Sequence, residues 1–165
     1  MTAPLTIRPA TGEDAPLLAG LLLPVFRQGD TYTVDPAISA EEAVALWCAT
    51  GKSVFIAEGR GVSLGTYYLR RNQDGGGAHV CNCGYVTANA ARGLGVARAM
   101  LDHSLEEARR QGYRAMQFNF VVATNTRAID IWARAGFETV GRLPGAFLHP
   151  TEGYVDALVM HRSLV

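Results

Sequence analysis

The sequence predicts a single α/β domain. Apolar strand segments and amphipathic helix segments follow one another in the order β-α-α-β-β-β-α-β-α-β-β. The 165 residues suit one ordinary core, and no repeat, low-complexity tract or linker divides them. A glycine-bearing turn joins an apolar strand to the longest predicted helix. We therefore expect one domain over residues 1–165, organised around that turn.

The first half of the chain predicts three strands and two helices. Thr11 and Ser39 each precede a helical pattern and are followed three residues later by Asp14 and Glu42, the arrangement of a capping box. The sequence Gly-Arg-Gly at 59–61 predicts a hairpin turn. The predicted elements are a strand at 5–8, a helix at 11–27, a turn-rich connection at 28–38, a helix at 39–50 and strands at 53–58 and 61–71.

The second half predicts four strands and two helices. The long helix carries its apolar residues at a spacing of three and four, as a helix packed on a sheet does. Asn125 is expected to cap the shorter helix. The predicted elements are strands at 78–86 and 115–122, a helix at 96–111, a helix at 126–135, a strand at 137–143, a loop at 144–153 and a strand at 154–162.

The turn at 91–97 predicts a diphosphate-binding site. The start of the following helix offers unpaired backbone N–H groups and the positive end of the helix dipole. Gly93 and Gly95 let the backbone approach a phosphate without a side chain in the way. The third glycine of a dinucleotide fingerprint is missing, and so is the Lys-Ser/Thr pair of a nucleoside-triphosphate loop.

Two motifs instead resemble the GNAT superfamily of acetyl-CoA-dependent N-acetyltransferases. Arg92-x-x-Gly95-x-Ala97 resembles its Arg/Gln-x-x-Gly-x-Gly/Ala signature. Asn125-x-x-Ala128-Ile129-x-x-Trp132-x-x-x-Gly136-Phe137 resembles its later block. The resemblance extends from Leu5 to about Leu164 and implies a mixed sheet of about seven strands with two helices on each face. It also implies acetyl-CoA as the co-substrate.

The resemblance implies a set of cofactor-binding residues. Val86 is expected to pair with the pantetheine arm and to supply an oxyanion N–H, and Asn125 is expected to offer its side-chain amide to the same arm. Trp132 stands where relatives often have a tyrosine, and an indole can donate a hydrogen bond but not a proton near neutral pH. The backbone N–H groups expected to hold the diphosphate belong to Arg92, Gly93, Leu94, Gly95, Val96 and Ala97.

The general base is less clear from the sequence. The strand at 78–86 lacks the glutamate that many relatives use. The nearby candidates are His79, His149 and Asp156, and ordered water is the alternative that we expect to act.

Two asparagines indicate an acceptor site. Asn82 and Asn119 interrupt apolar strands, and a buried amide without partners costs about 1–3 kcal/mol. The resemblance implies that their strands are adjacent and parallel and that the loop with Tyr32 covers the acceptor. On that arrangement the two asparagines predict a recognition and catalytic pair for a zwitterionic acceptor, in a pocket without a charged residue. Their reading as satisfied core amides stays open.

A narrower resemblance concerns the acceptor itself. Asn82, Asn119 and Asn125, together with 141–144 and 153–157, look like the yeast-type acetyltransferases of azetidine-2-carboxylate. It implies a small amino acid or cyclic imino acid as acceptor. Phosphinothricin-type enzymes, protein N-terminal or lysine acetyltransferases and a weakly catalytic acyl-CoA-binding regulatory domain are the alternatives.

Composition sets the remaining expectations. Fifteen basic and fifteen acidic residues give no net charge and form no basic tract, so a nucleic-acid partner is not expected. The N-terminus lacks signal-peptide features and the apolar run at 17–26 is too short to span a bilayer. Three cysteines and no metal-ligand spacing indicate a cytoplasmic protein without a metal site. The family resemblance suggests a homodimer.

Overall fold

The computed structural model describes residues 4–165 and contains one seven-stranded mixed sheet. The strand order is β1-β2-β3-β4-β5-β7-β6, and only β4 and β5 run parallel. The predicted α/β class, with a mixed sheet of seven strands, is confirmed. The strands are β1 (Thr6–Pro9), β2 (Lys52–Gly59), β3 (Val62–Arg71), β4 (Val80–Thr87), β5 (Ala115–Val122), β6 (Glu138–His149) and β7 (Gly153–Ser163).

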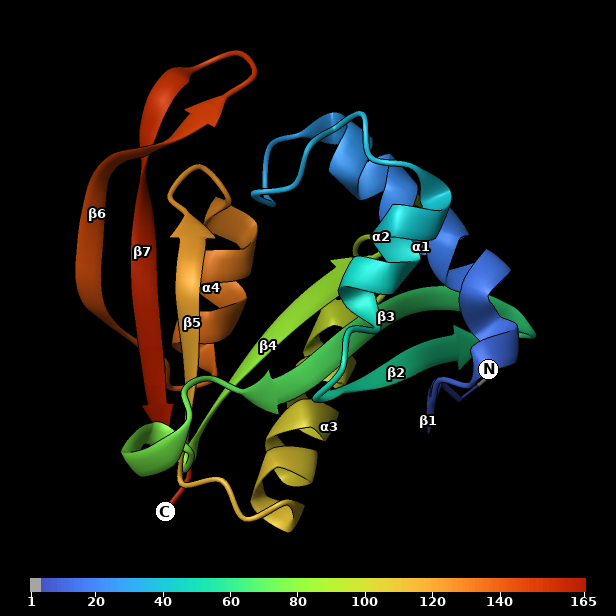
Figure 1. Cartoon of the computed structure of the whole chain (residues 1–165), viewed down its shortest axis with the longest axis horizontal. Helices are drawn as coiled ribbons and strands as arrows, with labels where there is room; N and C mark the ends of the chain where they lie inside the picture. Colours follow the sequence, from blue (N-terminus) through green and yellow to red (C-terminus); the bar gives the residue numbers. More distant parts are fainter. Residues whose placement is uncertain (1–3) are drawn as a thin grey trace.

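Two pairs of helices cover the two faces of the sheet (Figure 1). Buried residues of α1 (Ala15–Gln28) and α2 (Ala40–Trp47) form one hydrophobic cluster with β2 and β4. Buried residues of α3 (Val96–Arg110) and α4 (Thr126–Arg134) form the other, larger cluster. The expected arrangement of two helices on each face is confirmed.

The predicted capping boxes form at both N-terminal helices. The Asp14 carboxylate accepts a hydrogen bond from the Thr11 backbone N–H at 2.7 Å, across a short 3₁₀ turn that precedes α1. The Ser39 hydroxyl accepts from the Glu42 backbone N–H at 3.1 Å, and the Glu42 carboxylate accepts from the Ser39 backbone N–H at 2.9 Å. Side-chain capping therefore fixes where α2 and the 3₁₀ turn before α1 begin, and α1 itself starts four residues after Thr11, at Ala15.

The predicted loop at 144–153 is wrong, because most of it is strand. Phe147 pairs with Val155 and His149 with Gly153, which lengthens both β6 and β7. The pairing is interrupted between Leu143 and Phe147, where proline lacks an N–H and Gly145 has a φ of +55°. Pro and Gly predict a loop from sequence alone, but here they form an irregularity within a longer hairpin.

The sheet opens between its two parallel strands. Backbone pairing of β4 with β5 is limited to Val80 with Ala115 and Cys81 with Met116. Beyond these pairs the strands diverge toward their C-terminal ends (Figure 1). β5 continues against β7, with an irregularity between Phe118 and Val121. The opening exposes one edge of β4 and positions the site described below.

Candidate active site

A cavity of about 600 Å³ lies at this opening. Its walls come from the end of α1 and the loop after it, from β3, β4 and β5, from the first turn of α3, from α4 and from the end of β6. The structure brings eleven of the twelve predicted site residues to this one cavity: Tyr32, Asn82, Val86, Arg92, Gly93, Gly95, Val96, Ala97, Asn119, Asn125 and Trp132.

Leu94 is the exception among the predicted residues. Its side chain is 69% exposed and is not part of the cavity wall. Its backbone N–H, which was expected to face the diphosphate, donates to the Ala91 carbonyl at 3.2 Å instead. The Arg92 N–H is also used internally, by the Asn89 carbonyl at 3.3 Å. The expected set of backbone donors therefore includes two N–H groups, those of Arg92 and Leu94, that are already bonded within the chain.

The remaining N–H groups of the turn are available. Gly93 and Gly95 have φ values of +81° and +79°, a left-handed conformation that glycine adopts without strain. Gly95 caps α3 with its carbonyl, which accepts from the Ala99 N–H at 3.0 Å. No acceptor within residues 4–165 takes the N–H groups of Gly93, Gly95, Val96 or Ala97. Four donors at the positive end of a 15-residue helix suit a diphosphate.

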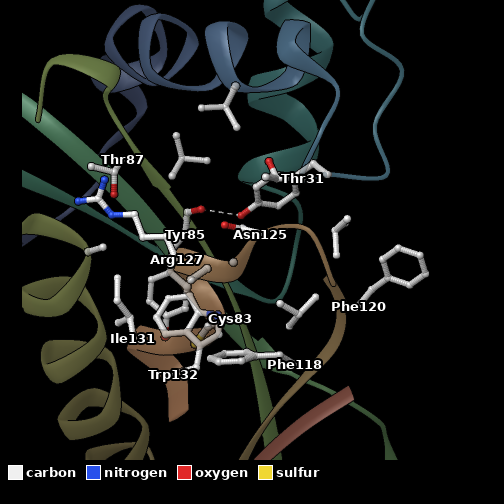
Figure 2. A pocket seen from close by; sticks show the side chains of 18 of the residues that line it. Thr31, Cys83, Tyr85, Thr87, Phe118, Phe120, Asn125, Arg127, Ile131 and Trp132 are labelled. Carbon is white, nitrogen blue, oxygen red and sulfur yellow. Dashed lines mark hydrogen bonds between the residues drawn. The ribbon is translucent and has the colours of Figure 1, made fainter. Parts of the chain in front are cut away.

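Arginine side chains surround this turn, and sequence reasoning missed their role. Arg92, Arg98 and Arg127 all line the cavity. Arg127 comes from α4 and extends into the cavity in Figure 2. Its terminal nitrogen lies 3.8 Å from where a side chain on Gly93 would begin. The charge faces the same space as the free N–H groups, so the two would act on one anion.

The expected backbone role of Val86 is wrong. Hydrogen-bonded pairs recur at every second residue of an antiparallel ladder. The Ala88 N–H donates to the Leu64 carbonyl at 2.8 Å, so the next such pair is Val86 with Thr66. The backbone groups of Val86 therefore face β3. Those of Tyr85 point the other way, toward the open edge.

Tyr32 reaches the open edge of β4 through its hydroxyl. The phenol donates to the Tyr85 carbonyl at 2.8 Å, the dashed bond drawn in Figure 2. Its ring packs edge-on against Phe26 and Trp47, with centroids 5.5 and 5.9 Å away. Burial raises the pKa of Tyr32, so the phenol is neutral. Tyr32 is thus a fixed wall of the cavity rather than a loose cover.

Asn82 and Asn119 line the cavity together, as predicted, and both are hydrogen bonded. The Asn82 amide donates to the Gln117 carbonyl at 2.9 Å, directly after the last backbone pair between β4 and β5. The Asn119 amide donates to the Asn72 side chain at 2.7 Å and accepts from the Gln117 side chain at 3.0 Å. Their predicted role in recognising the acceptor stays a prediction.

The expectation of a pocket without charge is wrong at the acceptor end. Arg70 of β3 lines the cavity, and its Nε donates to the Asn82 side-chain oxygen at 3.4 Å. Arg70 and Asn82 are paired across β3 and β4. The sequence contained only a weak signal for this contact. The register of β3 and β4 brings residue 70 opposite residue 82. The exact length of the turn between the two strands, which sets this register, could not be predicted from the sequence.

The two predicted cofactor residues of α4 face the cavity. Asn125 occupies the N-cap position of α4, but its side chain makes no capping hydrogen bond, contrary to expectation. Figure 2 shows it among the cavity side chains. The Trp132 ring is 7% exposed and lies 5.0 Å from Tyr85 and 5.1 Å from Phe118, centroid to centroid. Its indole N–H bonds no residue in the described part of the chain and is not a buried unsatisfied atom, so it is accessible to solvent.

The predicted base candidates do not gather at the cavity. His79 and Asp156 are not part of its wall. The Asp156 carboxylate accepts from the Gly145 N–H at 2.9 Å and from Arg142 at 2.7 Å, which lowers the pKa of Asp156. Its carboxylate is thus committed to the β6–β7 hairpin.

His149 does line the cavity, but its Nδ1 already accepts hydrogen bonds from the backbone. Nδ1 accepts from the backbone N–H groups of Thr151 and Glu152 at 3.2 and 3.3 Å. A neutral ring that accepts at Nδ1 carries its proton on Nε2, so it has no second lone pair for a substrate proton. Asp30, which sequence reasoning did not select, is the only carboxylate among the described residues of the cavity wall.

The described part of the chain lacks two further features. No group of three or more histidine, cysteine, aspartate or glutamate side chains in residues 4–165 could hold a metal ion. Over the same residues, no helix has the length and apolar character needed to cross a membrane.

The comparisons with known proteins agree with this geometry. The protein is 39% identical to a GCN5-related N-acetyltransferase from Kribbella flavida, whose structure superposes with a TM-score of 0.90 over 96% of this chain and 97% of that one. The structure of yncA from Salmonella typhimurium with its cofactor acetyl-CoA shares the fold at 21% identity, with a TM-score of 0.85 over 98% of this chain and 94% of that one.

A curated relative and a family match complete the comparison. The N-acetyltransferase aca1 of Schizosaccharomyces pombe is 36% identical over 97 residues, which cover 58% of this chain and 46% of that protein. The chain therefore spans about half of the length of that relative. Residues 25–137 match the model of a protein family that is described as "Acetyltransferase (GNAT) family". The chain belongs to the acetyltransferase (GNAT) family of enzymes.

Proposed function

We propose that the protein transfers the acetyl group of acetyl-CoA to the amine of a small molecule, an amino acid or a cyclic imino acid. One observation carries the proposal. A single cavity joins the free N–H groups at the start of α3 to the polar side chains of Asn82 and Asn119 through the opening between β4 and β5. A donor held on one side can thus meet an acceptor on the other.

The donor would be held along its whole length. The N–H groups of Gly93, Gly95, Val96 and Ala97 would bind the diphosphate, and Arg127 would add a charge beside them. The pantetheine arm would lie along the open edge of β4, where Asn125 can offer its side-chain amide. The acetyl-CoA that accompanies yncA supports this choice of donor.

The transfer itself would use few side chains. The amine nitrogen attacks the thioester carbonyl carbon, and the oxyanion would accept the backbone N–H of Tyr85, the residue that faces the opening. The Trp132 indole can stabilise the leaving thiolate with a hydrogen bond. The amine proton would pass to water in the cavity, whose wall contributes the Asp30 carboxylate.

The acceptor would lie beside the two asparagines. Each amide retains an N–H beyond the bond it makes to the protein, because a side-chain amide has two donor hydrogens. The match to a yeast N-acetyltransferase supports transfer to an amine nitrogen. The choice of a small amino acid rests on the two asparagines.

Release of free thiol from acetyl-CoA tests the proposal. The protein would be given amino acids, cyclic imino acids, phosphinothricin, polyamines and short peptides in parallel. Saturable release with small amino acids, and much weaker release with peptides, is the expected result. Preferential acetylation of peptides would support a protein acetyltransferase instead. If no acceptor causes thiol release, an acyl-CoA-binding domain without catalytic activity would be the better interpretation.

We also propose that the protein is a homodimer and acts in the cytoplasm. Exposed apolar side chains gather on the hairpin of β6, an edge strand, and β7: Val140, Leu143, Leu148 and Tyr154. A second copy would cover them. The three unpaired cysteines suit a reducing compartment. Light scattering should give the mass of a dimer for the parent and of a monomer for Tyr154→Arg. A monomeric parent would contradict the proposed dimer.

A further inference from the structure

We propose that Arg70 binds the carboxylate of the acceptor and so determines which amines the protein acetylates. This inference rests on the proposed acetyl transfer to a small amine. It concerns a residue that neither the sequence motifs nor the family resemblance selected. It narrows the acceptor to molecules that carry an acidic group close to the reacting nitrogen.

Arg70 is the charged residue at the acceptor end of the cavity. The other arginines of the wall, Arg92, Arg98 and Arg127, belong to the turn before α3 or to the first turns of α3 and α4. Arg98 is paired with Asp102 at 3.1 Å. No carboxylate in residues 4–165 forms an ion pair with Arg70. Its charge therefore faces the cavity without a counterion.

Asn82 orients this guanidinium. The Asn82 oxygen accepts from Arg70 Nε, while its amide nitrogen is fixed by the Gln117 carbonyl. The bond holds the guanidinium by Nε, and neither terminal nitrogen has a hydrogen-bond partner among residues 4–165. Two such nitrogens form the fork that binds a carboxylate with two parallel hydrogen bonds. Asn82 is in this view a positioning residue as well as a contact.

The surroundings strengthen the preference for an anion. Tyr68, which also lines the cavity, carries Lys52 over its ring, with the amine 4.1 Å from the ring centroid. Burial, and secondarily the charge of Arg70, lowers the pKa of Lys52. Two cations lie near one another here, and within the described part of the chain the Lys52 amine donates only to the Leu46 carbonyl. A bound carboxylate would relieve this repulsion.

The distance along β4 limits the acceptor to a short molecule. Asn82 and Tyr85 are three residues apart, which is about 10 Å of extended strand. A hydrogen-bonding contact at each end takes about 3 Å. About 4 Å is left between the carboxylate at Arg70 and the oxyanion at the Tyr85 N–H, and the reacting nitrogen attacks the carbon bonded to that oxyanion. An α- or β-amino acid, or a cyclic imino acid, fits this span, whereas the N-terminus of a peptide has no carboxylate there.

A matched pair of acceptors tests the role of Arg70. The best amino acid and its carboxamide differ only in the charge that Arg70 would bind. The parent should prefer the acid, and Arg70→Met, of similar length, should lower kcat/KM for the acid about 100-fold while changing the amide less than about threefold. Arg70→Lys should recover part of the loss, because it keeps the charge but not the fork. The KM for acetyl-CoA should stay the same in all three proteins.

Two results would overturn the proposal. Equal losses for acid and amide would mean that Arg70 only supports the sheet and Asn82. An unchanged kcat/KM for the acid in Arg70→Met would show that Arg70 has no role in recognising the acceptor.

A binding measurement keeps the test separate from the proposed reaction. If the parent acetylates nothing, the proposed function fails, but calorimetry of amino acid and amide against the protein saturated with CoA still tests Arg70. Tighter binding of the acid by the parent, lost in Arg70→Met, supports the assignment. Equal binding of acid and amide by the parent contradicts it.

Discussion

The two ends of the cavity are built in different ways. At the proposed cofactor end, the available polar groups are mainly backbone N–H groups of one continuous turn, those of Gly93, Gly95, Val96 and Ala97. At the acceptor end, the polar groups are side chains from elements far apart in the sequence: Tyr32, Arg70, Asn82 and Asn119.

This difference has a consequence for specificity. A backbone site depends on local conformation, so only a few residue types, glycine above all, are dictated by it. A side-chain site depends on which residues the fold brings together, so each position can be changed without disturbing the turn. The donor end should therefore tolerate few changes, whereas the acceptor end can vary in the amines it accepts.

The largest expected effect is at the donor end. Gly95→Asp adds a negative charge at a position whose N–H faces the expected diphosphate. Affinity for acetyl-CoA should fall more than about 100-fold, because the charge opposes the anion and the left-handed φ strains the backbone. Calorimetry with acetyl-CoA measures the change.

A control separates charge from strain in that variant. Gly95→Asn has the same shape without the charge, and asparagine tolerates the left-handed conformation. It should lose clearly less affinity than Gly95→Asp. Full affinity in the Asp variant would exclude this turn as the phosphate site.

At the acceptor end we expect a smaller and selective effect. Asn82→Ala and Asn119→Ala should each lower kcat/KM for the best small acceptor by about one to three orders of magnitude, since a hydrogen bond to a charged group is lost. The KM for acetyl-CoA should barely move. Steady-state kinetics with each substrate varied in turn distinguishes the two ends.

The same experiment can contradict the assignment of the asparagines. If both alanine variants acetylate the acceptor as well as the parent does, the two residues are core amides that only satisfy Gln117 and Asn72. Circular dichroism should accompany the kinetics, because Asn82 also bridges β4 and β5.

Arg127 allows a test within the cofactor end itself, because it contributes a side chain where most of the available donors are backbone N–H groups. Arg127→Met should raise the KM for acetyl-CoA about tenfold and leave the acceptor KM unchanged, because one charge is lost while the N–H groups remain. The dependence of that KM on salt should also weaken. An unchanged KM would show that the guanidinium faces the turn without binding the phosphates.

Trp132 should give the smallest effect. If the indole packs beside the pantetheine arm, as its contacts with Tyr85 and Phe118 suggest, then Trp132→Phe should reduce kcat less than about tenfold. Trp132→Tyr should behave similarly. A loss of 100-fold or more in Trp132→Phe, with normal folding, would mean that the indole N–H takes part in the chemistry.

The prediction from sequence was most accurate where the signals are local. The signals of a glycine turn or a capping box each lie within a few residues, so the turn before α3 and the beginning of α2 could be predicted. The box at Thr11 begins a 3₁₀ turn, and α1 follows it at Ala15. The loop at 144–153 was mispredicted for the same reason, because Pro144 and Gly145 are local loop signals that strand pairing with β7 overrides.

The sequence alone therefore determined the fold class, the position of the glycine turn that begins α3 and the presence of two unusual asparagines. Only the tertiary structure decided which backbone groups face the opening, because a shift of one residue in register reverses Val86 and Tyr85. It also decided that Arg70, on a strand of ordinary sequence, lies beside Asn82. Long-range pairing sets both outcomes, and a local pattern contains no information about the partner strand.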